Sequence, residues 1–552
     1  WLRKKKSTGE ITPDDIFLDS SNLPGLAVEQ FEGRIEHPVS SISVWMVGVG
    51  FVVSAIIFLW QTFDLQVMRG AQFAAAAQNN RLAHSLLFAQ RGVIYDRTGR
   101  ELAWNERDVA LPYSLRRYSD LSGLSHVLGF VRYPKTDSAG VWWRKDLTCV
   151  SGAEFIFNDM LDGVNGTEMA EVDALGEVSR RMLIEPPRDG KSVMLSIDAE
   201  MQSKLYDVLS VHASSQGFQG GAAVVIDVRT GEIIALTSIP EYSSQALTDG
   251  ASETVARYTN DSQKPFLDRA IGGAYTPGSI VKPIFAAGAL KEGIIVPEKS
   301  IFSPGYITIP NQYNPDKPTI IKDWRAHGWT NMREAISVSS DVYFFSIGGG
   351  YEEQEGLGIA RLDKYARAFG LGVRTEVDLV GEVSGVIPTP EWKTEIFGAD
   401  EPWRLGDTYN TAIGQYGFQV TPLQMARVYA AIANGGSLPA PHITASSTPV
   451  MTPTGVSDEY LKIVREGMRL AVTSPLGTTR ALDIIGFTIA GKTGTAEVGT
   501  RNQYMNSWVV GFWPYEKPQY AFAVVLERAP AGTLSGAAPA MRSFFDWLAT
   551  RD

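Results

Sequence analysis

The chain of 552 residues is 44% hydrophobic and 20% charged, which is typical of a folded protein, and its length predicts two or more domains. A net charge of -11 argues against nucleic acid as the main partner, because phosphate binding requires a basic surface. The single cysteine, Cys149, excludes an intrachain disulfide framework and a cysteine-rich metal site.

The N-terminal region predicts a polar tail and a membrane anchor. Residues 1–41 are polar, and Trp1 in place of Met indicates that the natural N-terminus lies upstream. Residues 42–63 carry no charged side chain, with Trp45 and Trp60 near the two ends. Since about 20 apolar residues at roughly 1.5 Å each span a bilayer core, we expect a transmembrane helix here rather than a buried core helix or a cleaved signal peptide.

Residues 64–195 mix short strand-like and helical pieces with many turns, and they contain no catalytic pattern. Within them, residues 90–103 predict a strand, a turn and a strand. From the residues alone this is a surface hairpin with Asp96 and Arg97 as charges of the turn. The composition changes near Glu185, so we place a domain boundary at 195/196.

The remaining residues, 196–552, predict an α+β domain. Asp198 is a predicted helix N-cap, and strands at 222–227 and 232–237 flank a turn. The later elements that we expect are helices at 331–337, 421–434 and 538–549 and strands at 486–490 (running into Lys492), 507–512 and 520–526. Strands at both ends with helices between them predict one antiparallel sheet built from the chain termini and covered by helices.

Candidate chemistry begins with Ser279 and Lys282, in the stretch Tyr275–Pro283. The turn residues before Ser279 and the Ala-rich run after it predict that a helix begins at or just after the serine. Residues three apart share a helix face, so Lys282 can reach back to the Ser279 hydroxyl. A lysine kept neutral by desolvation and by the helix dipole could accept the proton of the serine. Alone, this spacing is common in a long chain.

Two further motifs make the pair credible. The first, Ser339-Ser340-Asp341, is by itself a helix cap or turn. The second, Lys492-Thr493-Gly494-Thr495, lies at the end of an apolar strand, where a lysine and hydroxyls can bind a carboxylate and glycine admits an extended peptide. No HExxH motif and no Gly-x-Ser-x-Gly elbow compete with them. The combination of S-x-x-K, an S-x-D motif and K-T-G is unlike a chance occurrence.

With these motifs the chain resembles a class B penicillin-binding protein, a monofunctional peptidoglycan D,D-transpeptidase. The motifs that carry the resemblance are Arg91-Gly92, Asp96-Arg97, Tyr275 to Lys282, His327-Gly328, Ala412 to Gln415, Thr421 to Gln424 and Gly491 to Ala496. The resemblance implies a cytoplasmic tail (1–41), a transmembrane helix (42–63), a non-catalytic pedestal (64–195) and a penicillin-binding, serine β-lactamase-like transpeptidase domain (196–552).

Carried over residue by residue, the resemblance implies a role for each site residue. Ser279 would be the acylated nucleophile, Lys282 its base and Ser339 a proton relay. Asp341 would hold the donor peptide or the lysine network. The terminal carboxylate of a D-Ala-D-Ala stem would be bound by Lys492, Thr493, Gly494 and Thr495. The N–H groups of Ser279 and Thr495 would form the oxyanion hole.

The chain departs from the family pattern at three positions. Asp341 stands where many relatives have Asn, and relatives that act in wall elongation often have Asp, which favours elongation over division. Ser340 occupies the place of a Cys said to help bind zinc in some relatives, so we expect no metal. Tyr416 follows Gln415 where Gly is usual, so a bulky side chain enters the acceptor side.

The resemblance also implies a setting for the enzyme. It predicts a single-pass protein of the inner membrane whose catalytic domain lies in the periplasm, without a cofactor and inhibited by β-lactams. Its membrane partner would be a glycan polymerase of the SEDS family, RodA-like, or FtsW-like if the role is divisional. Two alternatives stay open: a D,D-carboxypeptidase or β-lactamase-like hydrolase, in which water replaces the amine, and a non-catalytic β-lactam sensor or scaffold.

Overall fold

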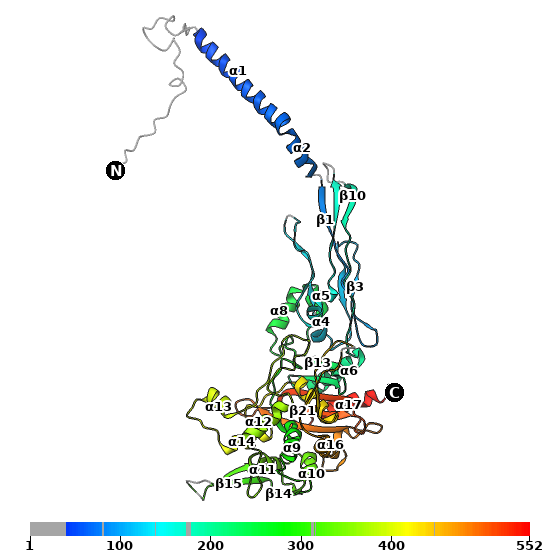
Figure 1. The fold of residues 1–552 in the computed structure, drawn as a ribbon, viewed down its shortest axis with the longest axis vertical. Helices are drawn as coiled ribbons and strands as arrows, with labels where there is room; N and C mark the ends of the chain where they lie inside the picture. Colours follow the sequence, from blue (N-terminus) through cyan, green and yellow to red (C-terminus); the bar gives the residue numbers. More distant parts are fainter. Residues whose placement is uncertain are drawn as a thin grey trace, which may run out of the picture. The chain divides into compact units, whose positions relative to one another are not determined.

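The computed structural model describes residues 40–79, 82–138, 140–172, 178–310, 314, 316–445 and 448–551 (Figure 1). The predicted tail therefore lies outside the described residues, except for its last two. The chain divides into two compact units, one of residues up to 85 with 169–182, the other of residues 86–168 with 183–552. The domain boundaries at 63/64 and 195/196 stay a prediction, because the compact units follow spatial contacts and not the roles on which those boundaries rest.

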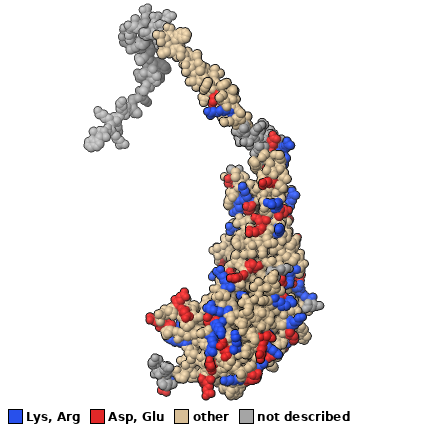
Figure 2. Space-filling model, in the orientation of Figure 1, with Lys and Arg blue, Asp and Glu red and all other residues tan. Residues whose placement is uncertain are grey.

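The first unit contains the predicted anchor. Helix α1 (Ser41–Phe63) is capped by Ser40, whose side chain accepts a hydrogen bond from Ile42 N, and it continues through the π-helix η3 (Asp64–Met68). Within the described residues, Ser41–Met68 is the one helix long and apolar enough to cross a membrane, and none of its scanned window is buried. Figure 2 shows α1 as a surface almost without charged side chains. The predicted helix is confirmed.

The other elements of this unit are the helix α2 (Gly70–Asn79) and parts of three strands. The strands are β1 (Leu82–Leu87), β9 (Gly166–Val172) and β10 (Val178–Glu185), and they pair in the order β1-β9-β10.

In the second unit, a four-stranded sheet contains the strand, turn and strand predicted at 90–103. Its order is β11-β2-β3-β4, with β11 at Val193–Met194, β2 at Ile94–Tyr95, β3 at Glu101–Glu106 and β4 at Leu115–Tyr118. The interpretation of Asp96 as a surface charge is wrong. Asp96 is 2% exposed, and its carboxylate accepts hydrogen bonds from the N–H groups of Thr98, Arg100 and Ala199. It thereby ties the turn to the first residue of α6 (Ala199–Gln216).

The same part of the unit holds several short elements. They are α3 (Ser125–Leu128), β5 (Val131–Arg132), β6 (Lys135–Thr136), β7 (Trp142–Arg144), β8 (Thr148–Cys149), α4 (Gly152–Ile156), α5 (Asn158–Leu161), α7 (Ser244–Thr248) and α8 (Ser252–Asn260). Glu154 is fully buried between Arg91 and Arg116, at 2.7 Å from each. A buried carboxylate with two guanidinium partners is neutralised, so this network fixes the short elements around it.

The largest sheet is antiparallel and has the order β13-β12-β22-β21-β20. Its strands are β12 (Gly220–Asp227), β13 (Ile233–Ile239), β20 (Ala490–Val498), β21 (Tyr504–Trp513) and β22 (Tyr520–Pro530). Early strands pair with late ones, so the predicted sheet of chain termini is confirmed. The predicted strand at 486–490 is wrong except at its end, because Tyr515 N donates to Thr488 O and takes that segment out of the ladder.

Helices cover both faces of this sheet, as Figure 1 shows. On one face α6 packs with α17 (Ala537–Leu548), and the predicted cap Asp198 accepts hydrogen bonds from Glu200 N and Met201 N. On the other face lie α9 (Lys282–Lys291), α15 (Pro422–Ala433) and α16 (Asp458–Thr473). β12 and β13 therefore bury both faces, and every residue of these two strands is buried.

The remaining elements surround these helices. They are η4 (Gly278–Val281), β14 (Ile301–Ser303), β15 (Tyr306–Ile309), β16 (Thr319–Lys322), β17 (Gly328–Thr330), α10 (Met332–Val338), α11 (Asp341–Gly349), α12 (Gly358–Ala368), α13 (Pro390–Phe397), α14 (Leu405–Ala412), β18 (Ser437–Pro439), β19 (Met451–Pro453) and η5 (Arg480–Leu482).

Candidate active site

Ser279 lies in a 3-10 turn that leads directly into α9. The turn, η4, spans Gly278–Val281, and Pro283 occupies the first turn of α9, where its missing N–H is not needed. Gly278 has φ +58°, and a Cβ placed there would lie 2.6 Å from the carbonyl oxygen of Thr495. Because only glycine permits this approach, the turn lies against strand β20 and brings Ser279 beside it.

Lys282 is fully buried and makes three hydrogen bonds. Its Nζ donates to Ser339 O (2.8 Å), to Ser339 Oγ (3.3 Å) and to Asp341 Oδ1 (2.6 Å). No hydrogen bond joins Lys282 to Ser279 among the described residues, although the two side chains share a face of the turn. Three acceptors from the α10–α11 junction therefore hold the ammonium group of Lys282.

The residues Ser339 and Ser340 form the junction between α10 and α11. Ser339 ends α10 in the left-handed conformation (φ +59°), and Ser340 caps α11 by accepting from Tyr343 N. Asp341 is the first residue of α11. The cap predicted for this motif is confirmed. Its tight reversal places the Ser339 hydroxyl and the Asp341 carboxylate on the same side, around the Lys282 ammonium group.

Lys492 reaches the same serine from the sheet. Its Nζ donates to Ser339 Oγ (2.8 Å) and to Thr493 O (2.8 Å), and the residue is fully buried in β20. Burial lowers the pKa of Lys492 well below its usual value, and the charge of Lys282 lowers it further, while Asp341 acts in the opposite direction. Ser339 Oγ thus accepts hydrogen bonds from two lysines, so its own O–H group remains available to donate to a third group.

These groups surround a cavity of about 380 Å³. It is lined by Ser279, Trp324, Ser339, Asp341, Ile413, Gln415, Thr478, Thr493, Gly494 and Thr495. All the site residues predicted from the sequence are thereby brought together: six line the cavity, and Lys282 and Lys492 lie directly behind it, bonded to Ser339. β20 is an edge strand of the sheet, so an extended peptide could pair with its free edge.

Sequence reasoning missed two residues of this cavity, Trp324 and Thr478. Trp324 Nε1 donates to Ser339 O at 3.3 Å, the same oxygen that accepts from Lys282. Its indole packs on the guanidinium of Arg325 and against the ring of His327. The one feature of the sequence that could have pointed to Trp324 is its closeness to His327. Thr478, bonded to Ser337 O, carried no signal at all.

The carboxylate of Asp323 anchors the Ser340 side of the junction. It accepts from Ser340 Oγ (3.1 Å) and Val342 N (3.0 Å), and it lies 3.4 Å from His327 Nε2. Burial raises the pKa of Asp323, but the hydrogen bonds from His327 and Val342 and the charge of Lys282 together hold it below its usual value. Ser340 Oγ is engaged as a donor to Asp323, and a hydroxyl lacks the thiolate that zinc prefers. The residues at this place therefore do not fit a zinc site.

Tyr416, the third departure from the family pattern, also has φ in the left-handed region (+60°). Its ring lies edge-on between Trp392 and Trp403, at centroid distances of 5.8 Å and 5.9 Å. The preceding residue, Gln415, lines the cavity and donates from Nε2 to Thr495 O at 3.5 Å. Two tryptophans thus hold a strained tyrosine beside the cavity wall.

Comparisons with known proteins agree with this geometry. Residues 221–546 match the family described as "Penicillin binding protein transpeptidase domain". The chain is 31% identical over 473 residues to the "Peptidoglycan D,D-transpeptidase MrdA" of Haemophilus influenzae, which covers 79% of this chain and 69% of the relative.

Two solved structures are similar over most of the chain. One is Pseudomonas aeruginosa PBP2 in complex with WCK 5153, with a TM-score of 0.67, 28% identity, and coverage of 84% of this chain and 97% of that chain. The other, described as "Structural coordination of polymerization and crosslinking by a peptidoglycan synthase complex", has a TM-score of 0.71, 26% identity, and coverage of 91% and 97%.

Proposed function

The chain belongs to the penicillin-binding protein transpeptidases, as a class B, elongation-type peptidoglycan D,D-transpeptidase, and from this membership we propose the roles of its site residues. Ser279 is the nucleophile that is acylated by the donor stem peptide. Lys282 and Ser339 move its proton, and Lys492, Thr493, Gly494 and Thr495 bind the donor. The observation that carries the proposal is the convergence of Ser279, Ser339 and Thr495 on one cavity, with both lysines bonded to Ser339.

In the acylation step, Ser279 Oγ attacks the carbonyl carbon of the D-Ala-D-Ala peptide bond. The proton of the hydroxyl passes to Lys282 once that lysine holds its free amine, and the Asp341 carboxylate supports the lysine from the other side. The N–H groups of Ser279 and Thr495 donate to the oxyanion of the tetrahedral intermediate. The carbon–nitrogen bond then breaks, and the leaving D-Ala amine takes a proton through Ser339, whose oxygen already accepts from both lysines.

Donor binding relies on the edge of β20. The D-Ala carboxylate pairs with Lys492 and accepts from the Thr493 and Thr495 hydroxyls. A bound carboxylate restores the charge of a lysine whose pKa burial has lowered, so donor and lysine stabilise each other. Gly494 allows β20 to lie against the turn that carries Ser279, because a Cβ there would lie 2.6 Å from Pro277 O.

In the second step, the amine of a neighbouring stem attacks the acyl-enzyme and releases Ser279. Transfer to an amine gives a crosslink, whereas transfer to water would give the hydrolase alternative.

The α1 helix anchors the chain as a single-pass membrane protein. We place the catalytic domain in the periplasm, where peptidoglycan lies. We also place α1 beside a membrane glycan polymerase of the RodA-like kind, because a similar structure is described as coordinating polymerization with crosslinking.

Labelling with a fluorescent penicillin tests the proposal. The wild-type chain should form a stable covalent adduct and Ser279→Ala should form none, because the attacking oxygen is lost. Ser252→Ala, at an exposed serine of α8, is the matched control and should label normally. Undiminished labelling of Ser279→Ala would refute the assignment, and rapid release of the label would favour the hydrolase.

A further inference from the structure

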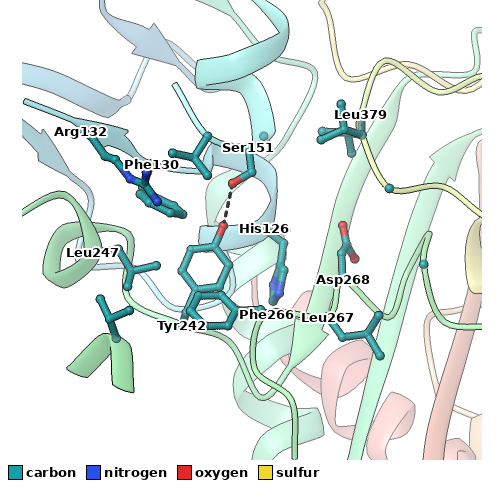
Figure 3. Close-up of a pocket in the computed structure, with 16 residues that line it drawn as sticks. His126, Phe130, Arg132, Ser151, Tyr242, Leu247, Phe266, Leu267, Asp268 and Leu379 are labelled. Atoms are coloured by element: carbon teal, nitrogen blue, oxygen red, sulfur yellow. Dashed lines mark hydrogen bonds between the residues drawn. The ribbon is translucent and has the colours of Figure 1, made fainter. Parts of the chain in front are cut away.

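A second cavity, larger than the catalytic one, lies elsewhere in the same unit. Its volume is about 500 Å³, within the range of small-molecule sites. Its walls are mainly apolar, with Phe130, Leu247, Phe266 and Leu379 among the lining side chains (Figure 3). They come from residues 126–152, the α7–α8 region, residues 266–272 and the loop at 379–381. Ser151 Oγ and Tyr242 OH, 3.3 Å apart, join two of these segments. None of these residues belongs to the catalytic machinery.

One carboxylate, that of Asp268, enters this apolar cavity. Figure 3 shows it between His126 and Leu379, facing the open space. Its Oδ1 accepts from Ala270 N at 3.0 Å. Burial raises the pKa of Asp268 to about 6, against the effects of backbone hydrogen bonds and the charge of Arg269. The group is therefore largely ionised at neutral pH, in a setting that desolvates it.

No cation neutralises this carboxylate among the described residues. Arg269 is the nearest guanidinium in sequence, but it is engaged by Glu527 (2.7 Å) and by backbone carbonyls. Arg132 lines the cavity as an exposed side chain and makes no ion pair with Asp268. Burial lowers the pKa of His126 to about 4, so its ring is neutral.

His126 adds a second unsatisfied acceptor to the same wall. Its Nε2 lies 3.0 Å from Pro265 O, which can only accept, so Nε2 carries the proton and Nδ1 holds a lone pair. Nδ1 has no partner among the described residues, and the residue is 7% exposed. An ionised carboxylate without a paired cation and a buried nitrogen without a hydrogen-bond partner thus belong to residues that line the same apolar cavity.

We propose that this cavity is a binding site for a small organic cation, in which an ammonium group pairs with Asp268 and an apolar body fills the space between Phe130, Phe266 and Leu379. Charge complementarity selects the cation, because pairing removes the cost of an unpaired, half-buried carboxylate. The apolar walls select the body, because each buried carbon adds hydrophobic free energy. A neutral ligand would gain only the second contribution, and an anion would meet repulsion from Asp268.

The test is a binding measurement on the detergent-solubilised full chain with three probes of one shape. By isothermal titration calorimetry at pH 7.5, tryptamine should bind at least tenfold more tightly than neutral indole-3-ethanol, and indole-3-propionate should bind most weakly. Asp268→Asn keeps the size and the acceptor for Ala270 N but loses the charge, so it should abolish the preference for tryptamine. Asp261→Asn, a carboxylate outside the cavity, is the matched control and should bind like wild type.

A second variant keeps the test decisive if Asp268→Asn proves unstable. Val380→Trp, at a half-exposed residue that lines the cavity, leaves Asp268 unchanged in sequence but should fill part of the space and weaken tryptamine binding at least tenfold. Three outcomes overturn the proposal: no tryptamine binding up to its solubility, equal affinity for tryptamine and indole-3-ethanol, or unchanged binding in both variants. A preference for indole-3-propionate would also overturn it and would assign the cavity to anions through Arg132.

Discussion

Lys492 donates a 2.8 Å hydrogen bond to Ser339 Oγ, although 153 residues separate the two in sequence. Ser339 also accepts from Lys282, so a single hydroxyl links β20, where we propose that the donor binds, to the first residue of α9, next to the turn that carries Ser279. Perturbing any of these three groups should therefore change both donor binding and proton transfer. The predictions below separate the two effects.

The first prediction concerns the ion pair of Lys282 with Asp341. Asp341→Ala leaves a fully buried ammonium group with only the Ser339 oxygens, and we expect acylation by a fluorescent penicillin to slow by roughly 100-fold. Asp341→Asn retains an acceptor oxygen, so its rate should stay within about tenfold of wild type. Stopped-flow acylation rates check both values. Equal losses in the two variants would show that the acceptor at this position does not support the lysine.

The second prediction concerns pH and Lys492. The charged form binds a carboxylate and exists below the pKa, which burial places well below the ordinary lysine value of 10.5. As pH rises through that lowered pKa, the charge is lost, so affinity for a β-lactam carboxylate should decline at a pH well below 10.5. Lys492→Arg, which stays charged, should remove this decline, even if its affinity at neutral pH is lower. The dissociation constant of the non-covalent complex, measured across pH, distinguishes the outcomes. An identical pH profile in both proteins would contradict the assignment.

The third prediction uses two glycines with similar backbone conformations. Gly278→Ala places a Cβ 2.6 Å from Thr495 O, so the turn must move away from β20 and carry Ser279 with it. Acylation should slow by at least about tenfold, because misplacement of the nucleophile by even 1 Å is costly. Gly293 also has positive φ, but a Cβ added there would meet no other atom within 4 Å. Gly293→Ala therefore carries the backbone strain without the clash. If both variants lose the same activity, the contact with Thr495 is not responsible.

The fourth prediction concerns Tyr416. Tyr416→Gly relieves the left-handed backbone strain but removes the ring packed between Trp392 and Trp403. We expect a net loss of about 1 to 2 kcal/mol in the free energy of unfolding, because the lost ring contacts exceed the relieved strain. Denaturant unfolding followed by tryptophan fluorescence measures this loss. Tyr416→Phe keeps the ring and serves as control, and a stabilised Tyr416→Gly variant would show that strain dominates.

The chemistry of this site was largely predictable because it resides in short motifs. Ser279 is indicated by its spacing to Lys282, while Ser339 and Lys492 are indicated by the combination of three motifs and the resemblance that they carry, and the structure brings all three residues together. The sequence predicts that Lys282 reaches the Ser279 hydroxyl, whereas the hydrogen bonds that the structure gives to Lys282 go to Ser339 and Asp341. Spacing along one helix shows which side chains share a face, but it does not show that the α10–α11 junction offers Lys282 three competing acceptors.

The fold was predictable where periodicity was strong and less so elsewhere. The sheet of chain termini follows from apolar runs bounded by turns, and helix α17 follows from an amphipathic pattern. The burial of Asp96 does not follow from any local pattern, because its partner Ala199 lies about 100 residues away in the sequence. Thr488 was assigned to a strand because its neighbours are apolar, yet its carbonyl pairs with Tyr515 outside the ladder. Such tertiary partners leave no local trace in a sequence.

The pairing of β12 with β22 also sets the order in which activity can arise. Residues 220–227 have their ladder partners at 520–527, so this central strand pair cannot form before residues 520–527 have been synthesised. Contacts of such sequence separation close slowly. Ser279, the proposed nucleophile, is therefore synthesised well before the strands β20 and β22 that complete its surroundings. A chain that stops short of residue 490 would carry Ser279 without Lys492 and its bond to Ser339, so we expect it to be unable to acylate until β20 is in place.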